Sequence, residues 1–116
     1  PVPLRTDYAP IAEQVAHAVA NGEAEKGILC CGTGIGISIA ANKVKGAYAA
    51  CIHDVYQAQR AQLSNHANII TMGSQVIGIE LAKQLVKEYL SVEWDPNADL
   101  LQMYSCLLYT SDAADD

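Results

Sequence analysis

The sequence predicts an α/β protein with a Rossmann-like, three-layer α/β/α arrangement around a parallel sheet. Short apolar runs of strand length alternate three times with segments of helical periodicity. The connections between them are short, as right-handed strand-helix-strand units require. The first apolar run also meets its helix through a glycine-rich loop, GTGIG, at the end of a strand where ligands bind in such sheets.

The first half of the chain contains a helix, a strand and a second helix. The first helix is predicted over residues 10–21, where apolar residues recur at helical spacing before the stop signal Asn21-Gly22. Residues 28–31 form a short apolar run bounded by glycines, which suits a buried parallel strand. The next helix is expected over residues 35–43, beginning inside the glycine loop.

The second half repeats the strand-helix unit twice. An apolar run over residues 47–52 predicts a strand, and Asp54 is placed to cap the helix that follows it. A third run over residues 69–72 predicts the last strand. Gly73-Ser74 then opens a helix, and its apolar stripe is expected to face the core: Ile77, Leu81, Leu85 and Tyr89.

Both ends depart from this alternation. The first helix has no preceding strand, so we expect a strand-helix-strand unit to be missing in front of it, and we interpret the opening PVPLRTDYAP as a loop. After Trp94-Asp95-Pro96 the periodicity stops, and the acidic stretch that follows is interpreted as disordered or foreign sequence. The prediction is one partial domain over residues 1–95, truncated at its N-terminus, and a tail over residues 96–116.

Composition and charge argue against several function classes. The 116 residues carry a formal charge of −6 with few, scattered Lys and Arg, which argues against a nucleic-acid-binding protein. No apolar stretch reaches the roughly 18 residues that a membrane span needs. The four cysteines lack the spacing of zinc ligands, so no metal site is predicted and free thiols in a reducing cytoplasm fit best.

The glycine loop CCGTGIG has more than one interpretation. Gly32, Gly34 and Gly36 lie between a strand and a helix, so backbone amides can face an anion there. The loop lacks the Lys-Ser or Lys-Thr pair of nucleotide hydrolases, and its third glycine comes one position too early for the dinucleotide fingerprint. Asp54, about 20 residues further on, keeps a nucleotide-binding interpretation open. The simplest alternative is that the glycines only permit a tight turn.

Cys31 is the candidate for chemistry in this loop. As the last residue of the predicted strand it lies at the positive end of the next helix, which lowers the pKa of a thiol. The alternative is a small buried hydrophobic residue, and that is the role expected of Cys30 and Cys51. His53 and His66 flank predicted strands and could move protons near neutral pH, or be solvated loop residues.

Residues 5–95 resemble the sugar-phosphate isomerase family of type B ribose-5-phosphate isomerase and the galactose-6-phosphate isomerase subunits. The resemblance is carried by CGTGIGISIAANK and continues through NIITMGSQVIGIELAKQLVKEYL. It implies a cytoplasmic aldose-ketose isomerase of phosphorylated sugars that needs no cofactor or metal and acts as a homodimer or homotetramer. Ribose 5-phosphate is the expected substrate. The alternatives are galactose 6-phosphate, another hexose or tetrose phosphate, or a non-catalytic subunit that binds sugar phosphates.

The resemblance also implies roles for single residues. Cys31 resembles the base that removes the proton next to the carbonyl group, and Thr33 faces the enediolate as a second catalytic residue. Such a reaction needs one tuned base and fixed donors aimed at the developing oxyanion. The remaining positions are expected to bind the substrate: Tyr8, Gly32, Gly34, Gly36, Ser38, Asn65 and His66.

The chain departs from the family pattern in places that matter for the substrate. The family's opening strand with its Asp-His pair and its phosphate-binding C-terminal arginines have no match in this sequence. Ser64 stands where many members carry a histidine, and His66 follows two positions later. Ring opening, phosphate binding and the identity of the sugar are therefore left open by the sequence.

Overall fold

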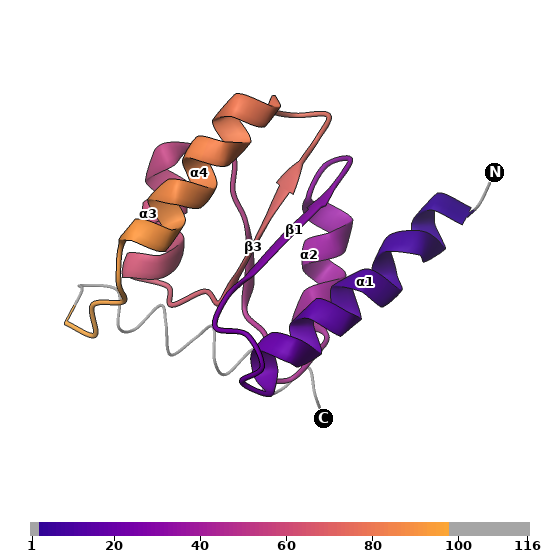
Figure 1. Cartoon of the computed structure of the whole chain (residues 1–116), viewed down its shortest axis with the longest axis horizontal. Coiled ribbons are helices and arrows are strands. Elements are labelled where there is room, and N and C mark those ends of the chain that lie inside the picture. Colours follow the sequence, from indigo (N-terminus) through magenta and orange to yellow (C-terminus); the bar gives the residue numbers. More distant parts are fainter. Residues whose placement is uncertain (1–2, 98–116) are drawn as a thin grey trace.

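Within residues 3–97, the part of the chain described by this computed structural model, three parallel strands form a sheet with helices on both faces (Figure 1). Side chains are described from residue 8 onward. The elements are α1 (Pro3–Ala20), β1 (Gly27–Cys31), α2 (Ile35–Asn42), β2 (Ala49–Cys51), α3 (Val55–Leu63), β3 (Ile69–Gly73) and α4 (Ile79–Ser91). In the sheet, β3 lies between β1 and β2, and both pair with it in parallel. The predicted Rossmann-like fold with a parallel sheet is confirmed.

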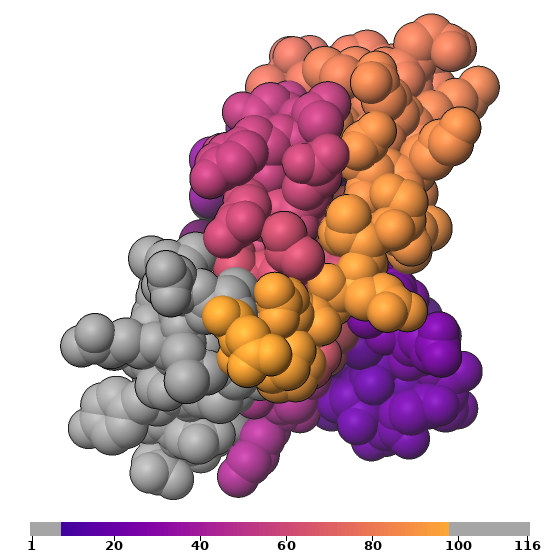
Figure 2. Space-filling model, turned by 90° about the vertical axis from the view of Figure 1, so that its left-hand side faces the viewer, coloured from indigo at the N-terminus to yellow at the C-terminus, as the bar shows by residue number. Residues whose placement is uncertain are grey.

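Each face of the sheet buries its own apolar core. Helices α1 and α2 cover one face, and α3 and α4 lie side by side over the other (Figure 2). The first core contains Ala12, Ala16, Val19, Leu29, Ile37, Ala41, Ala47 and Ile69. The second contains Ile52, Ala58, Ala61, Ala67, Ile70, Met72, Leu85 and Tyr89. Because side chains alternate along a strand, β3 supplies both cores and is buried over its whole length.

Helix α3 follows the sequence pattern closely, whereas β2 contains only three of the six residues of the predicted strand. The carboxylate of Asp54 accepts a hydrogen bond from the Gln57 amide at 2.7 Å, which is the predicted N-cap. At β2, the Asn42 side chain accepts from the Ala49 amide at 2.7 Å and donates to the Ala49 carbonyl at 2.9 Å. An amide side chain of α2 thus takes the place of a neighbouring strand.

The opening of the chain is a helix, so its interpretation as a loop is wrong. Helix α1 begins at Pro3 and runs through Pro10, although a proline inside a helix removes one backbone hydrogen bond. Packing outweighs this local preference, because Tyr8 of the same helix packs against the core beneath α2.

Helix α4 begins later than the sequence indicates. It starts at Ile79 instead of directly after Ser74, because the amides of residues 74–77 bond back to carbonyls of residues 31, 32 and 73. Of the expected stripe, Leu85 and Tyr89 are buried, and Ile77 is partly buried just before the helix begins. Leu81 is exposed, so the prediction is wrong at this position.

Across residues 3–97, no helix combines the length and apolar character that a membrane crossing needs. The predicted tail over residues 96–116 lies outside the described residues from residue 98 onward.

Candidate active site

The glycine loop joins β1 to α2 at the carboxyl edge of the sheet and is pressed against the end of β3. Gly34 has φ +82°, a left-handed conformation that side chains rarely adopt, and a Cβ there would lie 2.8 Å from the carbonyl carbon of Met72. From the other side, a Cβ on Gly73 would lie 2.6 Å from the carbonyl carbon of Thr33. Glycine at both positions allows the two backbones to approach this closely.

Hydrogen bonds from β3 and the turn after it hold the loop. The buried hydroxyl of Thr71 donates to the Gly34 carbonyl at 2.7 Å. The Ser74 amide donates to the Cys31 carbonyl at 2.8 Å, and the Gln75 amide to the Gly32 carbonyl at 2.9 Å. These hydrogen bonds hold the backbone of the glycine loop against β3 and the turn that follows it.

Cys31 lies half-exposed at the point where β1 meets this loop. Its Sγ accepts a hydrogen bond from the Gly34 amide at 3.1 Å. Burial alone would raise the pKa of the Cys31 thiol, but amides of the loop and of the first turn of α2, with the Thr33 hydroxyl, lower it below that of an ordinary thiol. Thr33 itself is exposed, and its Oγ1 accepts from the Ile35 amide at 3.2 Å. This arrangement favours the thiolate form of Cys31 more than the surroundings of an ordinary thiol do.

Cys30, the neighbouring thiol, belongs to the opposite face of β1. It lines an apolar hollow of about 260 Å³ together with Met72, Ile77 and Ala82. Burial raises the pKa of Cys30, and the adjacent Cys31 charge raises it further. The pKa values of these two consecutive cysteines are therefore shifted in opposite directions.

We expect these two thiols to be alkylated over different pH ranges. The thiolate is the reacting form, and its fraction rises as the pH passes the pKa. Because the pKa of Cys31 is lowered and that of Cys30 is raised, the rate at Cys31 should level off at lower pH. Iodoacetamide labelling with tandem mass spectrometry measures both rates in one chain, and identical pH profiles would contradict the assignment.

Tyr8 joins this edge from α1. A Cβ on Gly36 would overlap the Tyr8 hydroxyl and lie 3.0 Å from its Cζ, so the tyrosine ring rests on the first turn of α2. Tyr8 and Cys31 pack against the same core. The structure thus brings together the predicted residues Tyr8, Cys31, Thr33, Gly32, Gly34 and Gly36, and their roles toward a substrate stay predictions.

Ser38 and Asn65 are placed less favourably for the same site. Ser38 is buried in α2, with 8% of its surface exposed. Asn65 follows α3 and donates to the Arg60 carbonyl at 3.1 Å. It precedes β3 and lines a hollow of about 200 Å³ with Cys51 and Ile52, whereas Cys31 is at the carboxyl end of β1. One chain does not bring Asn65 next to Cys31.

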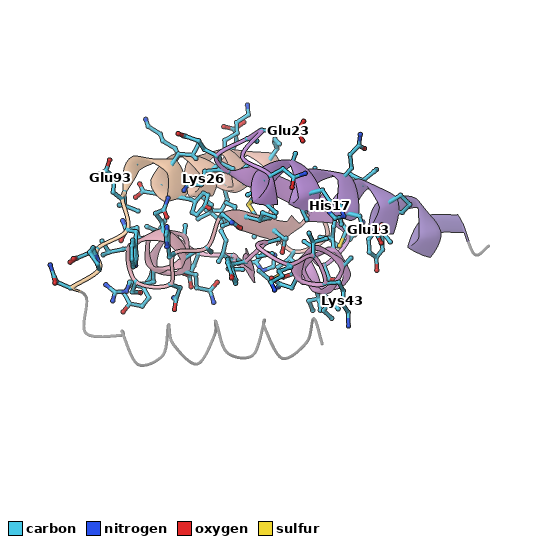
Figure 3. The ribbon with its side chains drawn as sticks, turned by 90° about the horizontal axis from the view of Figure 1, so that it is seen from below. Glu13, His17, Glu23, Lys26, Lys43 and Glu93 are labelled. Atoms are coloured by element: carbon cyan, nitrogen blue, oxygen red, sulfur yellow. The ribbon has the colours of Figure 1, made fainter. Side chains whose placement is uncertain are left out.

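His66 also lies at the amino edge of the sheet. Its ring stacks on Trp94 with centroids 4.1 Å apart, and its backbone has φ 51°. Burial lowers the pKa of His66, and the charge of Lys26 lowers it further. Lys26 comes directly before β1, and Figure 3 looks onto this end of the molecule. Within one chain His66 is therefore part of the packing around Trp94, far from the glycine loop.

The structure adds Gly73 to the site and gives a hydrogen-bond partner to His53, which the sequence offered only as a possible proton-transfer residue. The Thr33 backbone packs directly against Gly73. The Gly73 amide donates a hydrogen bond to Nε2 of His53 at 2.9 Å. The sequence signal that could have indicated Gly73 is a glycine at the end of a predicted strand. In the structure this glycine pairs with Cys31 of the neighbouring strand. For His53 the sequence indicated a place near this edge but no partner.

The described residues offer thiols but no metal-binding cluster. Cys30, Cys31 and Cys51 are free. Among residues 3–97, no group of three or more His, Cys, Asp or Glu side chains is arranged to hold a metal ion.

Comparison with known proteins places the chain in a family. A sequence profile described as Ribose/Galactose Isomerase matches residues 3–102. The chain belongs to this family. D-erythrulose-4-phosphate isomerase 2 of Mycolicibacterium smegmatis is 53% identical over 93 residues, which are 80% of this chain and 61% of that protein. Ribose-5-phosphate isomerase B of Escherichia coli is 50% identical over 91 residues, 78% of this chain and 61% of that protein.

A solved structure agrees with these sequence matches. The type B ribose 5-phosphate isomerase of Trypanosoma cruzi superposes with a TM-score of 0.84 at 35% identity, covering 91% of this chain and 71% of that one. The family resemblance read from CGTGIGISIAANK is therefore confirmed. The chain spans about three fifths of the length of the two curated relatives.

Proposed function

We propose that this chain carries the catalytic loop of an aldose-ketose isomerase that acts on phosphorylated sugars. The observation that carries the proposal is the Sγ of Cys31, held by the Gly34 amide at 3.1 Å where α2 begins. A thiolate there is suited to remove a proton from the carbon next to a carbonyl group. Membership of the family and the isomerase names of the relatives support this activity.

In the proposed reaction the Cys31 thiolate takes the proton from C2 of the open-chain aldose. The electron pair left behind forms the double bond between C1 and C2, and negative charge develops on O1. Thr33 and amides at the start of α2 are the nearby donors for that oxygen. The thiol then returns a proton to C1 while the O2 proton moves to O1, which yields the ketose and restores the thiolate.

The direct test is an isomerisation assay on the full-length protein. Ribose 5-phosphate is the first substrate, and formation of its ketose is followed by proton NMR. Turnover that is lost in step with the alkylation of Cys31, followed by mass spectrometry, is the expected result. Turnover that survives complete alkylation of Cys31 would argue against the proposed base, and absence of turnover with every sugar phosphate would argue for a non-catalytic subunit.

A phosphorylated tetrose is the second candidate substrate. Ser64 is buried, and its hydroxyl donates to the Arg60 carbonyl at 3.2 Å, so this position offers no titratable group for ring opening. A tetrose 4-phosphate has no free hydroxyl that could close a five-membered ring, so it needs no such group. The comparison is kcat/KM for D-erythrulose 4-phosphate against kcat/KM for ribose 5-phosphate. A larger value for the tetrose would favour this candidate.

The proposed enzyme is a homodimer or a homotetramer in which a second copy supplies Asn65. The support is the separation of Asn65 from Cys31 within one chain, at opposite edges of the sheet. Mixing Cys31→Ala and Asn65→Ala subunits should restore activity, because each mixed dimer contains one intact site. Mixtures that stay as inactive as the two variants alone would contradict the shared site.

The contact between Gly36 and Tyr8 leads to a further prediction. A Cβ on Gly36 displaces the end of the Tyr8 side chain, so Gly36→Ala and Tyr8→Ala should both raise KM for the sugar phosphate. Because they disturb one contact, the double variant should be no worse than either alone, with a coupling energy of about 0.5–3 kcal/mol. Gly78→Ala is the control, since nothing lies within 4 Å of a Cβ there. Additive effects on KM would show that Tyr8 does not act through this contact.

A further inference from the structure

His53 is a half-buried side chain at the carboxyl edge of the sheet that the proposed reaction does not use. Strand β2 ends at Cys51, and the Ile52 amide still donates to the Thr71 carbonyl at 3.0 Å. Beyond this point the backbone of β2 leaves the sheet. The His53 side chain then reaches back, and its Nε2 accepts from the Gly73 amide at 2.9 Å.

This hydrogen bond provides an acceptor for the buried Gly73 amide, which no longer has a partner in β2 because that strand ends at Cys51. Gly73 is buried and ends β3, and a buried amide without an acceptor is costly. Only a ring nitrogen without a proton can accept, so this bond needs neutral His53 with its proton on Nδ1. The His53 amide donates to Oε1 of Gln57 at 2.8 Å, which holds the residue at the start of α3.

The Gly73 peptide in turn supports the loop that carries Cys31. A Cβ on Gly73 would overlap the Thr33 backbone, and a Cβ on Gly34 would lie 3.1 Å from the Gly73 nitrogen. A rotation of the Gly73 peptide therefore has no free space and must move Thr33 and Gly34. The Gly34 amide is the group that donates to Sγ of Cys31.

We propose that His53 is a positioning residue of this site: by accepting the Gly73 amide it fixes the peptide against which the Cys31–Gly34 loop is packed. His53 does not touch Cys31. It acts through Gly73 and Gly34, and its removal loosens the amide that stabilises the thiolate. This inference rests on the proposed role of Cys31, but its test follows the thiol and does not depend on turnover.

The test compares His53→Leu, which has no acceptor, with His53→Gln, whose amide oxygen can still accept. Both are made in a Cys30→Ser background, and the rate of Cys31 alkylation by iodoacetamide is measured against pH. For His53→Leu we expect a rate about tenfold lower at neutral pH and a profile displaced to higher pH. His53→Gln should stay within about twofold of the parent chain, by the same hydrogen-bond argument.

The matched control is His17→Leu, which removes an exposed histidine of α1 (Figure 3). It should leave the alkylation profile unchanged. An unchanged profile for a folded His53→Leu chain would overturn the proposal, as would equal losses for the Leu and Gln variants.

A second measurement decides the question if His53→Leu does not fold. The ¹⁵N NMR signals of the His53 ring in the parent chain report which nitrogen carries the proton. We expect an unprotonated Nε2 and slow exchange of the Gly73 amide. A proton on Nε2 at neutral pH would overturn the proposal. If the alkylation results hold and no sugar phosphate is turned over, the proposed function fails and the positioning role stands.

Discussion

Replacing Cys31 by alanine is expected to lower kcat for sugar-phosphate isomerisation by about 10²- to 10⁴-fold, the usual contribution of a general base. KM should change little, because the loop amides and Tyr8 remain in place. The physical reason is the lowered pKa of Cys31, which results from amide and hydroxyl donors that act on its half-exposed Sγ. Steady-state kinetics on the purified variant measure both constants.

The controls for this prediction are the neighbouring cysteines. Cys30→Ala removes a thiol of raised pKa on the other face of β1, and Cys51→Ala removes one that lies beneath Gly34. Both variants should keep kcat within a few-fold of the parent. A loss at Cys30 as large as the loss at Cys31 would mean that the wrong thiol has been assigned.

The largest effect on stability is expected for Gly34→Ala. The residue has φ +82°, and an added Cβ would lie 2.8 Å from backbone of β3, which cannot move aside like a flexible side chain. The left-handed conformation costs about 1–2 kcal/mol for a residue with a side chain, and overpacking adds about 1–3 kcal/mol. Urea unfolding should show a loss of about 2–5 kcal/mol in the free energy of unfolding.

Gly22→Ala is a matched control, because Gly22 has φ +83° but nothing lies within 4 Å of a Cβ there. It should lose only the conformational part, about 1–2 kcal/mol. The difference between the two variants isolates the contact between the glycine loop and β3. Equal losses would mean that the loop is not pressed against the strand.

The parts of the fold that the sequence predicted well are those set by local pattern. The apolar runs became β1 and β3, and Asp54 caps α3 because its carboxylate reaches an amide three residues away. The predictions failed where packing between distant elements decided the structure. Helix α1 extends through Pro10 because it is held against α2, and α4 begins only at Ile79 because the turn after β3 first bonds to β1.

The same distinction applies to the candidate site. Cys31 and its donors lie within seven positions of one another, from Cys31 to Ile37, so the strand-loop-helix pattern was enough to predict them. His53 and Gly73 are 20 positions apart, and no periodicity reveals their hydrogen bond. Asn65 and His66 were assigned to the site by the family resemblance. The predicted strand over residues 69–72 already placed both before it, and in the structure they precede β3 at its amino end.

The central claim, that the Cys31 thiolate removes the proton next to the carbonyl group, is tested most directly by hydrogen exchange in D₂O. The full-length protein is incubated with an isomerisable sugar phosphate, and deuterium at C1 and C2 is followed by NMR and mass spectrometry. We predict that deuterium from solvent enters these positions with the parent protein and that Cys31→Ala slows this exchange at least as strongly as it slows isomerisation. Exchange at the parent rate in Cys31→Ala would contradict the claim, because another group would then be the base.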